Sequence, residues 1–154
     1  LDDRALDSVG TDTIIAAAAG YVIDRQTIAT QPSRLDVIDP GTDHITTEGP
    51  YRMTTYVETR NGWALNPINP VTFNIVSSDP GVILIDSAAA VNPTGDTATA
   101  VVDTSRTYGY FKVRFVGTGS ARLRVFAPGF DADSTYLITV TGGVPTRLEQ
   151  LWAR

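Results

Sequence analysis

The chain has 154 residues, 42% of them hydrophobic, and it carries a formal net charge of -5. This length predicts a single domain with an apolar core, which buries roughly 70% of the surface that the unfolded chain exposes. The acidic balance argues against binding to nucleic acid or to an anionic membrane, and the absence of cysteine excludes disulfides, thiolate metal sites and cysteine nucleophiles.

Residues 1–30 are expected to form an N-terminal arm or appended segment, because they show no clear alternation of period two. Asp12 or Thr13 can cap a short helix over Ile14–Ala19, and a buried strand over Tyr21–Ile23 is the alternative. The segment either packs on the domain's own core or docks on a neighbouring chain. Its longest apolar run is about half as long as a membrane-spanning helix needs to be.

Residues 31–142 alternate between short runs rich in Val, Ile, Thr, Tyr and Phe and turns rich in Gly, Pro, Asn and Asp. Eight strands are predicted, over residues 34–38, 51–59, 71–76, 82–86, 97–102, 110–116, 121–126 and 135–140. Short strands at this spacing predict an all-β fold, an antiparallel sandwich or barrel. No helical period interrupts them, which argues against a parallel α/β fold.

The segment FKVRFVGTGSARLRV, residues 111–125, alternates apolar and cationic residues around a glycine-rich centre. We predict a hairpin with a three-residue loop over Gly117–Gly119. Its outer face would carry Lys112 opposite Arg124 and Arg114 opposite Arg122. Opposed like charges destabilise a sheet, so this patch needs a counter-charge. Carboxylates of the same chain, an acidic surface of a partner or second copy, and an anionic ligand are the alternatives.

The C-terminal tail, residues 143–154, places Leu148, Leu151 and Trp152 on one face of a short helical turn. The tail either folds back as a cap on the sandwich or docks on a partner, because an exposed face of Trp and Leu would otherwise stay in water. The first residue is Leu1 and not methionine, which indicates a chain that is processed, trimmed or only partly represented. Removal of a leader would fit a secreted protein.

The stretch VTFNIVSSDPGVILID, residues 71–86, resembles bacterial immunoglobulin-like domains of the Big type. In that family a strand ends in a Ser-Ser-Asp-Pro turn, and a second apolar strand follows. The runs TGDTATAVV, GSARLRVFA and STYLITVTG resemble later strands of the family, so that the resemblance covers residues 31–142, although Phe73 stands where the family often has Trp. The resemblance implies an immunoglobulin-like β-sandwich, secretion or surface display, and a structural or adhesive role.

No residue combination typical of catalysis is found, and we predict neither catalytic residues nor a cofactor. His44 is the only histidine; we expect it to be exposed in a loop, with no nucleophile motif for a triad and too few companions for zinc. Asp131 and Asp133 could ligate calcium, but the calcium-loop pattern is absent, and an ordinary turn accounts for them.

These observations predict a non-catalytic structural or adhesive module of a secreted or surface-displayed bacterial or phage protein. Its partners would be other protein subunits or copies of itself, with neither nucleic acid nor a membrane-spanning segment involved. The residues expected to make the contacts are Lys112, Arg114, Arg122, Arg124, Trp63, Leu148, Leu151 and Trp152. The alternative is a carbohydrate-binding module in which Trp63, Tyr108 and Tyr110 stack on a polysaccharide.

Overall fold

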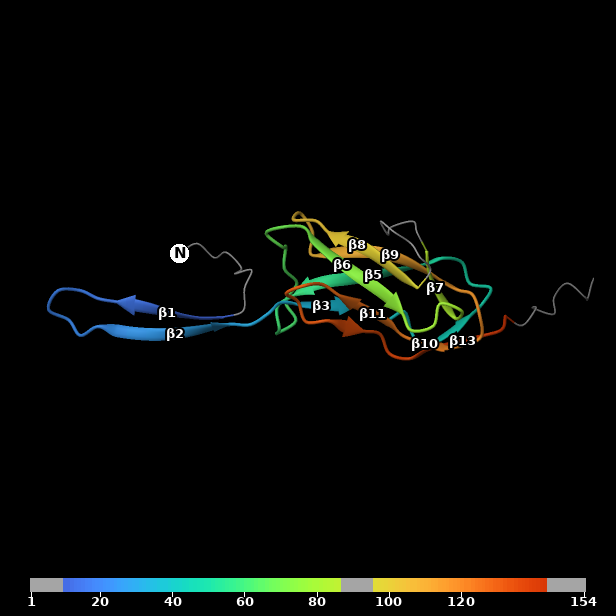
Figure 1. Cartoon of the computed structure of the whole chain (residues 1–154), viewed down its shortest axis with the longest axis horizontal. Coiled ribbons are helices and arrows are strands. Elements are labelled where there is room, and N and C mark those ends of the chain that lie inside the picture. The colour runs from blue at the N-terminus through green and yellow to red at the C-terminus, as the bar shows by residue number, and fades with distance from the viewer. Residues whose placement is uncertain (1–9, 87–95, 144–154) are drawn as a thin grey trace, which may run out of the picture.

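The computed structural model describes residues 10–86 and 96–143, whose regular elements are all β-strands (Figure 1). The strands are β1 (Gly10–Ala16), β2 (Asp24–Thr30), β3 (Arg34–Val37), β4 (Asp43–Ile45), β5 (Tyr51–Glu58), β6 (Val71–Ser77), β7 (Ile83–Asp86), β8 (Thr97–Val102), β9 (Tyr108–Phe115), β10 (Gly119–Ala121), β11 (Leu123–Phe126), β12 (Asp133–Ser134) and β13 (Ile138–Thr141). Six of the eight predicted strands are present with slightly different bounds. The strand predicted over residues 121–126 is divided between β10 and β11, which belong to different sheets, and the one predicted over residues 135–140 begins only at Ile138.

The strands after the arm form an immunoglobulin-like antiparallel β-sandwich. One sheet has the order β3-β5-β9-β7 and the other has the order β12-β11-β6-β8. A three-stranded sheet in the order β10-β13-β4 completes one end, and in it β13 runs parallel to β4. The predicted fold class is therefore confirmed.

Alternating apolar side chains from both sheets fill the space between them. The largest fully buried side chains are Phe73, Phe111, Phe115, Leu35, Met53, Ile75, Ile83, Ile85, Leu123, Ile138, Val57 and Val102. Burial of each such side chain stabilises the fold by roughly 1.5–3 kcal/mol relative to exposure. Phe73, at the position where the resembling family often has Trp, is completely buried.

Two connections that lie next to each other cross from one sheet to the other. The turn after β6 leads from one sheet to β7 in the other, and the link after β9 leads back toward β10. The amides of Val116 and Gly117 both donate to the carbonyl oxygen of Val82, at 2.9 and 3.4 Å. A Cβ at position 117 would collide with the carbonyl oxygen of Gly81. Glycine is therefore needed at position 117 because two backbone segments approach closely there.

The predicted hairpin between FKVRFV and SARLRV is wrong. β9 pairs with β5 and β7, whereas β11 pairs with β6 and β12. Lys112 lies opposite Arg52 and Asp86 in the register, and Arg124 lies opposite Val76. The predicted alternation is confirmed, since the apolar positions of both strands are buried. A chain that crosses from one sheet to the other shows the same alternation, because both of its strands face the same core. The close approach of Gly117 to Gly81 allows this crossing.

The N-terminal arm is a β-hairpin of β1 and β2 that projects from one end of the sandwich (Figure 1). The predicted helix over Ile14–Ala19 and the alternative buried strand over Tyr21–Ile23 are both wrong. Ile14 and Ile15 lie in β1, which pairs with β2, and the chain then turns at Gly20, whose φ is 84°. Tyr21 and Val22, which follow this turn, are 80% and 95% exposed.

Of the tail predicted over residues 143–154, the structure describes Gly143 alone, so Leu148, Leu151 and Trp152 lie outside the described residues. The last described strand, β13, lies at the opposite end of the sandwich from the arm (Figure 1). The described chain therefore enters the sandwich at one end of its long axis and finishes near the other.

Candidate interaction surfaces

The first two cations of the predicted patch lie on the outer face of β9. Arg114 Nε donates to Asp86 Oδ2 at 2.8 Å, so a carboxylate of the neighbouring strand β7 provides its counter-charge. Lys112 lies beside the same Asp86 in the register and is half-buried. For Arg114, the counter-charge is thus the first of the three expected alternatives, a carboxylate of the chain itself.

The other two cations lie on the outer face of the opposite sheet. The Arg124 guanidinium carbon is 5.3 Å from the centroid of the Phe126 ring, within the range of a cation–π contact. Arg122 is held at the start of β11 by backbone bonds with Ser78: its amide donates to Ser78 Oγ, and its carbonyl accepts from the Ser78 amide, both at 2.9 Å. A single patch of four cations is therefore not formed, because the two halves belong to different sheets.

A row of tyrosines, Tyr56, Tyr108 and Tyr110, crosses the outer face of β5 and β9. The Tyr56 and Tyr108 rings are 5.7 Å apart between centroids, and the Tyr108 and Tyr110 rings are 5.2 Å apart. The Arg52 guanidinium carbon lies 4.6 Å from the Tyr110 ring centroid. A side-chain hydrogen bond with Tyr108 raises the pKa of Tyr110. Partly exposed rings beside a cation can stack on a ligand and donate hydrogen bonds to it.

Tyr108 and Tyr110 were predicted as stacking residues, whereas Tyr56 and Arg52 were missed. The period-two alternation of β5 puts Arg52 and Tyr56 on one face, but only the pairing of β5 with β9 brings that face beside Tyr108. Trp63, the third predicted stacking residue, lies in the turn after β5 and is 74% exposed. In the described part of the chain, its ring makes no contact with the tyrosine row.

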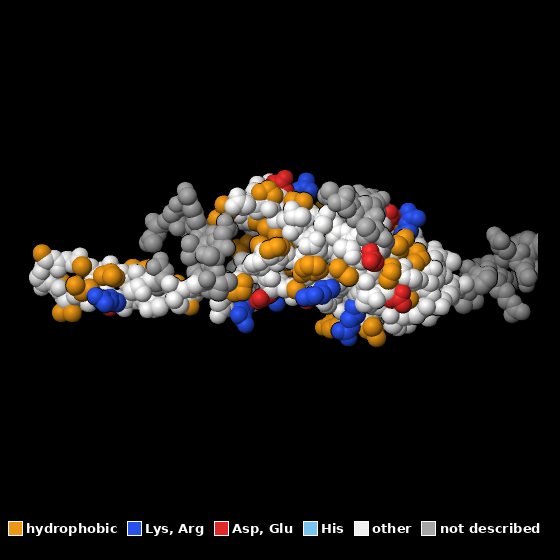
Figure 2. Space-filling model, viewed as in Figure 1, with side chains coloured by type: hydrophobic (Ala, Val, Ile, Leu, Met, Phe, Trp, Pro, Cys, Tyr) orange, Lys and Arg blue, Asp and Glu red, His pale blue; other side chains and the backbone are white. Residues whose placement is uncertain are grey.

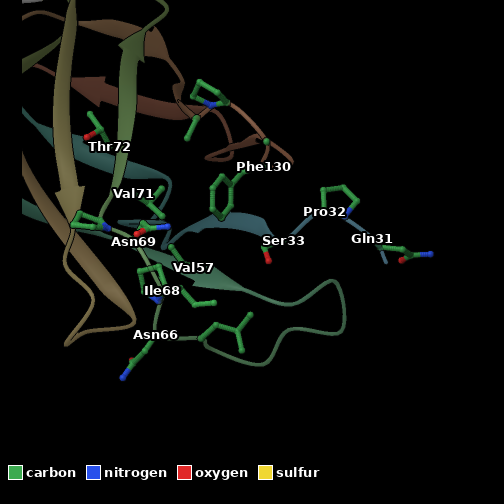
Figure 3. A pocket seen from close by; sticks show the side chains of 16 residues that line it. Gln31, Pro32, Ser33, Val57, Asn66, Ile68, Asn69, Val71, Thr72 and Phe130 are labelled. Carbon is green, nitrogen blue, oxygen red and sulfur yellow. The ribbon is translucent and has the colours of Figure 1, made fainter. Parts of the chain in front are cut away.

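A groove of about 490 Å³ lies at the end of the sandwich where the arm begins (Figure 3). Pro32 lines it at the root of the arm, Leu65 and Ile68 line it from the loop between β5 and β6, and Phe130 points into it from the loop after β11. None of the described residues that line it carries a charge. The groove thus offers apolar and amide contacts, and it lacks the charged groups that acid–base catalysis generally uses.

The expectation of an exposed His44 is wrong, because this side chain is 8% exposed. Its ring stacks on Phe115 with centroids 4.0 Å apart, Tyr51 packs edge-on at 5.7 Å, and Nδ1 lies 2.7 Å from Glu48 Oε2. Burial opposes the charged form of Glu48, but the hydrogen bonds from His44 and from the Ile45 amide outweigh it and lower the pKa of Glu48. This pair fastens the loop after β4 to the core.

Asp131 and Asp133 bond the backbone of β3. The Leu35 amide donates to the carbonyl oxygen of Asp131, and the Val37 amide donates to Asp133 Oδ2, each at 2.9 Å. Both bonds occupy the outer edge of β3, which would otherwise present free amides. Calcium at these two residues stays an untested alternative to the predicted turn. Within residues 10–86 and 96–143, no group of three or more His, Cys, Asp or Glu is placed to hold a metal ion.

No protein-family model and no curated protein sequence matches the chain. Among solved structures, a member of glycosyl hydrolase family 2 from Bacteroides cellulosilyticus is similar, with a TM-score of 0.55 and 13% identity over 87% of this chain and 18% of that one. A beta-glycosidase from Bacteroides vulgatus gives a TM-score of 0.55 and 14% identity over 86% and 18%. Surface layer protein SbsC, domains 1–6, reaches a TM-score of 0.49 at 13% identity over 89% and 17%.

The likeness to the two glycosidase structures is one of fold alone, since their sequences are so different from this one. The chain spans less than a fifth of the length of those structures, so their activities do not transfer to it. No helix in the described ranges combines the length and the apolar character of a membrane span.

Proposed function

We propose that the chain is a non-catalytic structural or adhesive module of a secreted or surface-displayed bacterial or phage protein, of the bacterial immunoglobulin-like type. It works by contacts with other protein subunits. One observation carries this proposal. The two-stranded arm exposes apolar side chains to water, and none of them belongs to the core of the sandwich. Figure 2 shows these apolar side chains along the arm and at its tip.

The arm exposes more large apolar side chains than a surface that stays in water usually carries. Ile14, Ile15 and Ile23 are 48%, 56% and 54% exposed, and Tyr21 and Val22 are more exposed still. Large apolar side chains exposed together in one segment are typical of sites that contact another protein. A two-stranded ribbon can also add to a further sheet.

A non-catalytic role is supported by the chemistry of the described surfaces. The groove at the root of the arm carries no charged side chain among its described residues, and His44 is used in packing. The glycosidase structures that share the fold are far longer than this chain, which matches only a small part of each.

Sedimentation velocity of the intact chain, of a deletion of residues 1–30 and of Val22→Ser tests the arm as the contact surface. We expect concentration-dependent association of the intact chain, weakened in Val22→Ser and lost in the deletion. Ile45→Ser is the matched control, since Ile45 is also exposed but lies on the sandwich. Identical assembly of the intact and truncated chains would exclude the arm as the contact.

A second candidate function is carbohydrate binding, which the tyrosine row with Arg52 favours. A glycan array and titrations with Tyr108→Ala test it, because this change removes the central ring of the row. Tyr136→Ala is the control, since Tyr136 is an exposed tyrosine outside the row. A chain that binds no glycan, or that binds equally well in both variants, lacks this function.

A further inference from the structure

The arm repeats a part of the sandwich. Residues 10–25 match residues 119–134 without a gap, at a spacing of 109 positions, as from Gly10 to Gly119. At this spacing the turn Ala-Ala-Gly-Tyr that ends at Tyr21 matches the turn Ala-Pro-Gly-Phe that ends at Phe130. The corresponding pairs are Gly10 and Gly119, Thr11 and Ser120, Ile14 and Leu123, Ala18 and Ala127, Gly20 and Gly129, Tyr21 and Phe130, and Asp24 and Asp133.

The backbone of the two turns is the same at the same spacing. The Tyr21 amide donates to the Ala18 carbonyl oxygen at 3.1 Å, and its counterpart, the Phe130 amide, donates to the carbonyl oxygen of Ala127 at 3.3 Å. The glycine of each turn lies in the left-handed region, with φ of 84° in the arm and 79° in the sandwich. A positive φ at this position favours glycine, so the shared residue has a shared cause.

The strand register next to the turn is also the same. β1 and β2 place Ile15 opposite Arg25 and Ala16 opposite Asp24. The equivalent pairs of β11 and β12 are Arg124 opposite Ser134 and Val125 opposite Asp133, each 109 positions further along the chain. Sequence, turn and pairing therefore agree that β1–β2 has the local structure of the β11–β12 hairpin, which closes the sandwich.

The two hairpins differ in what covers them. Leu123 is completely buried in the sandwich core, and Phe130 packs against that core. Their counterparts in the arm, Ile14 and Tyr21, are 48% and 80% exposed. The arm therefore has a side that is built to face a core, and none of the described residues provides that core.

A second repeat lies at the beginning of the sandwich. The motif PSRLDVI, residues 32–38, leads into and through β3, and PTRLEQL recurs at residues 145–151, a spacing of 113 positions. Proline, arginine and leucine are identical, and Ser/Thr, Asp/Glu and Ile/Leu are conservative replacements. The sequence thus reads as a closing hairpin, one complete module and a second opening motif, in the order that a tandem array requires.

We infer that β1–β2 is the closing hairpin of a further immunoglobulin-like module, which precedes this sandwich in the same polypeptide, and that the apolar core of that module covers Ile14 and Tyr21. This inference rests on the proposed structural function and specifies the partner of the arm. That partner is a sandwich of the same fold, whose core lacks the side chains that the arm supplies. The arm and β13 lie at opposite ends of the sandwich (Figure 1), so successive modules follow one another along its long axis.

Single cysteines test this inference, because the chain contains no cysteine of its own. Ile14→Cys and Ala16→Cys probe the side whose counterparts are buried, and Ile15→Cys probes the outer side, whose counterpart is the exposed Arg124. Thiol labelling is measured in the present chain and in a product of the gene that extends upstream by about 110 residues, one repeat spacing. The extended product without an added cysteine gives the background.

All three positions should label rapidly in the present chain. In the extended product, positions 14 and 16 should label on the order of a hundredfold more slowly, since labelling then requires local opening, while position 15 stays fast. Equal rates at 14 and 15 in the extended product, or an upstream segment that forms no sandwich, would overturn the inference. Labelling is measured at protein concentrations below the onset of the association seen by sedimentation, so that a second copy does not cover position 14.

The labelling result is separable from the test of the proposed function. Glycan binding at the tyrosine row would weaken the structural role without changing the protection of position 14. Conversely, unprotected thiols in the extended product would leave any association measured by sedimentation in place.

Discussion

Replacement of Gly117 by alanine tests the crossing of the chain between the sheets. A methyl group at this position meets the carbonyl oxygen of Gly81, which belongs to the other crossing connection and is part of the backbone. Overpacking of this kind costs about 1–3 kcal/mol. The hydrogen bonds from the amides of Val116 and Gly117 to Val82 are placed at risk as well, at about 0.5–1.5 kcal/mol each. The expected loss is therefore about 2–6 kcal/mol in the free energy of unfolding.

Urea unfolding followed by circular dichroism measures this loss, provided that the transition is two-state. Gly49→Ala is the matched control, since a Cβ there meets no atom within 4 Å and should change stability by less than about 1 kcal/mol. In the hairpin that the sequence predicted, position 117 is the first residue of an exposed loop, and alanine would be tolerated. A Gly117→Ala variant as stable as the control would therefore refute the crossing.

Four further substitutions compare the core, the pair of His44 with Glu48 and the surface. Leu123→Ala should lower the free energy of unfolding by about 2–5 kcal/mol, whereas Ile14→Ala, at the equivalent position of the arm, should change it by less than about 0.5 kcal/mol in this chain; equal effects would contradict the assignment of the core. Because the pKa of Glu48 is lowered in the fold, its contribution to stability should be complete above the unfolded pKa and disappear as the pH falls through the folded one. Glu48→Gln should remove this part of the pH dependence of unfolding, and an unchanged profile would count against the pair with His44. Arg114→Ala should cost at most about 1 kcal/mol in thermal unfolding, because its ion pair is exposed.

Strand positions and inward-facing residues could be predicted from the sequence because both follow from local alternation. The pairing of β9 could not, since a hairpin and a crossing between sheets bury the same apolar positions. What separates them is the contact between Gly117 and Gly81, which lie far apart in the sequence.

The burial of His44 could not be predicted either, because the residues that surround it are far away in the sequence. Its loop is polar in sequence, and it is buried because Phe115 and Tyr51 come from other strands and because β4 pairs with β13 near the end of the chain. The structure of the arm could have been predicted. Ala-Ala-Gly-Tyr and Ala-Pro-Gly-Phe are visible in the sequence at one spacing, and their comparison predicts a hairpin over residues 10–25 in place of a helix.

The central claim is that the sandwich is complete in itself and that the arm is made for a different core. The free energy of unfolding of residues 31–143, compared with that of the whole chain, tests this claim most directly. The account predicts values that agree within about 0.5 kcal/mol, because no side chain of β1 or β2 belongs to the sandwich core. A loss of more than about 2 kcal/mol on removal of the arm would contradict it, because a loss of that size is typical of residues that belong to a core.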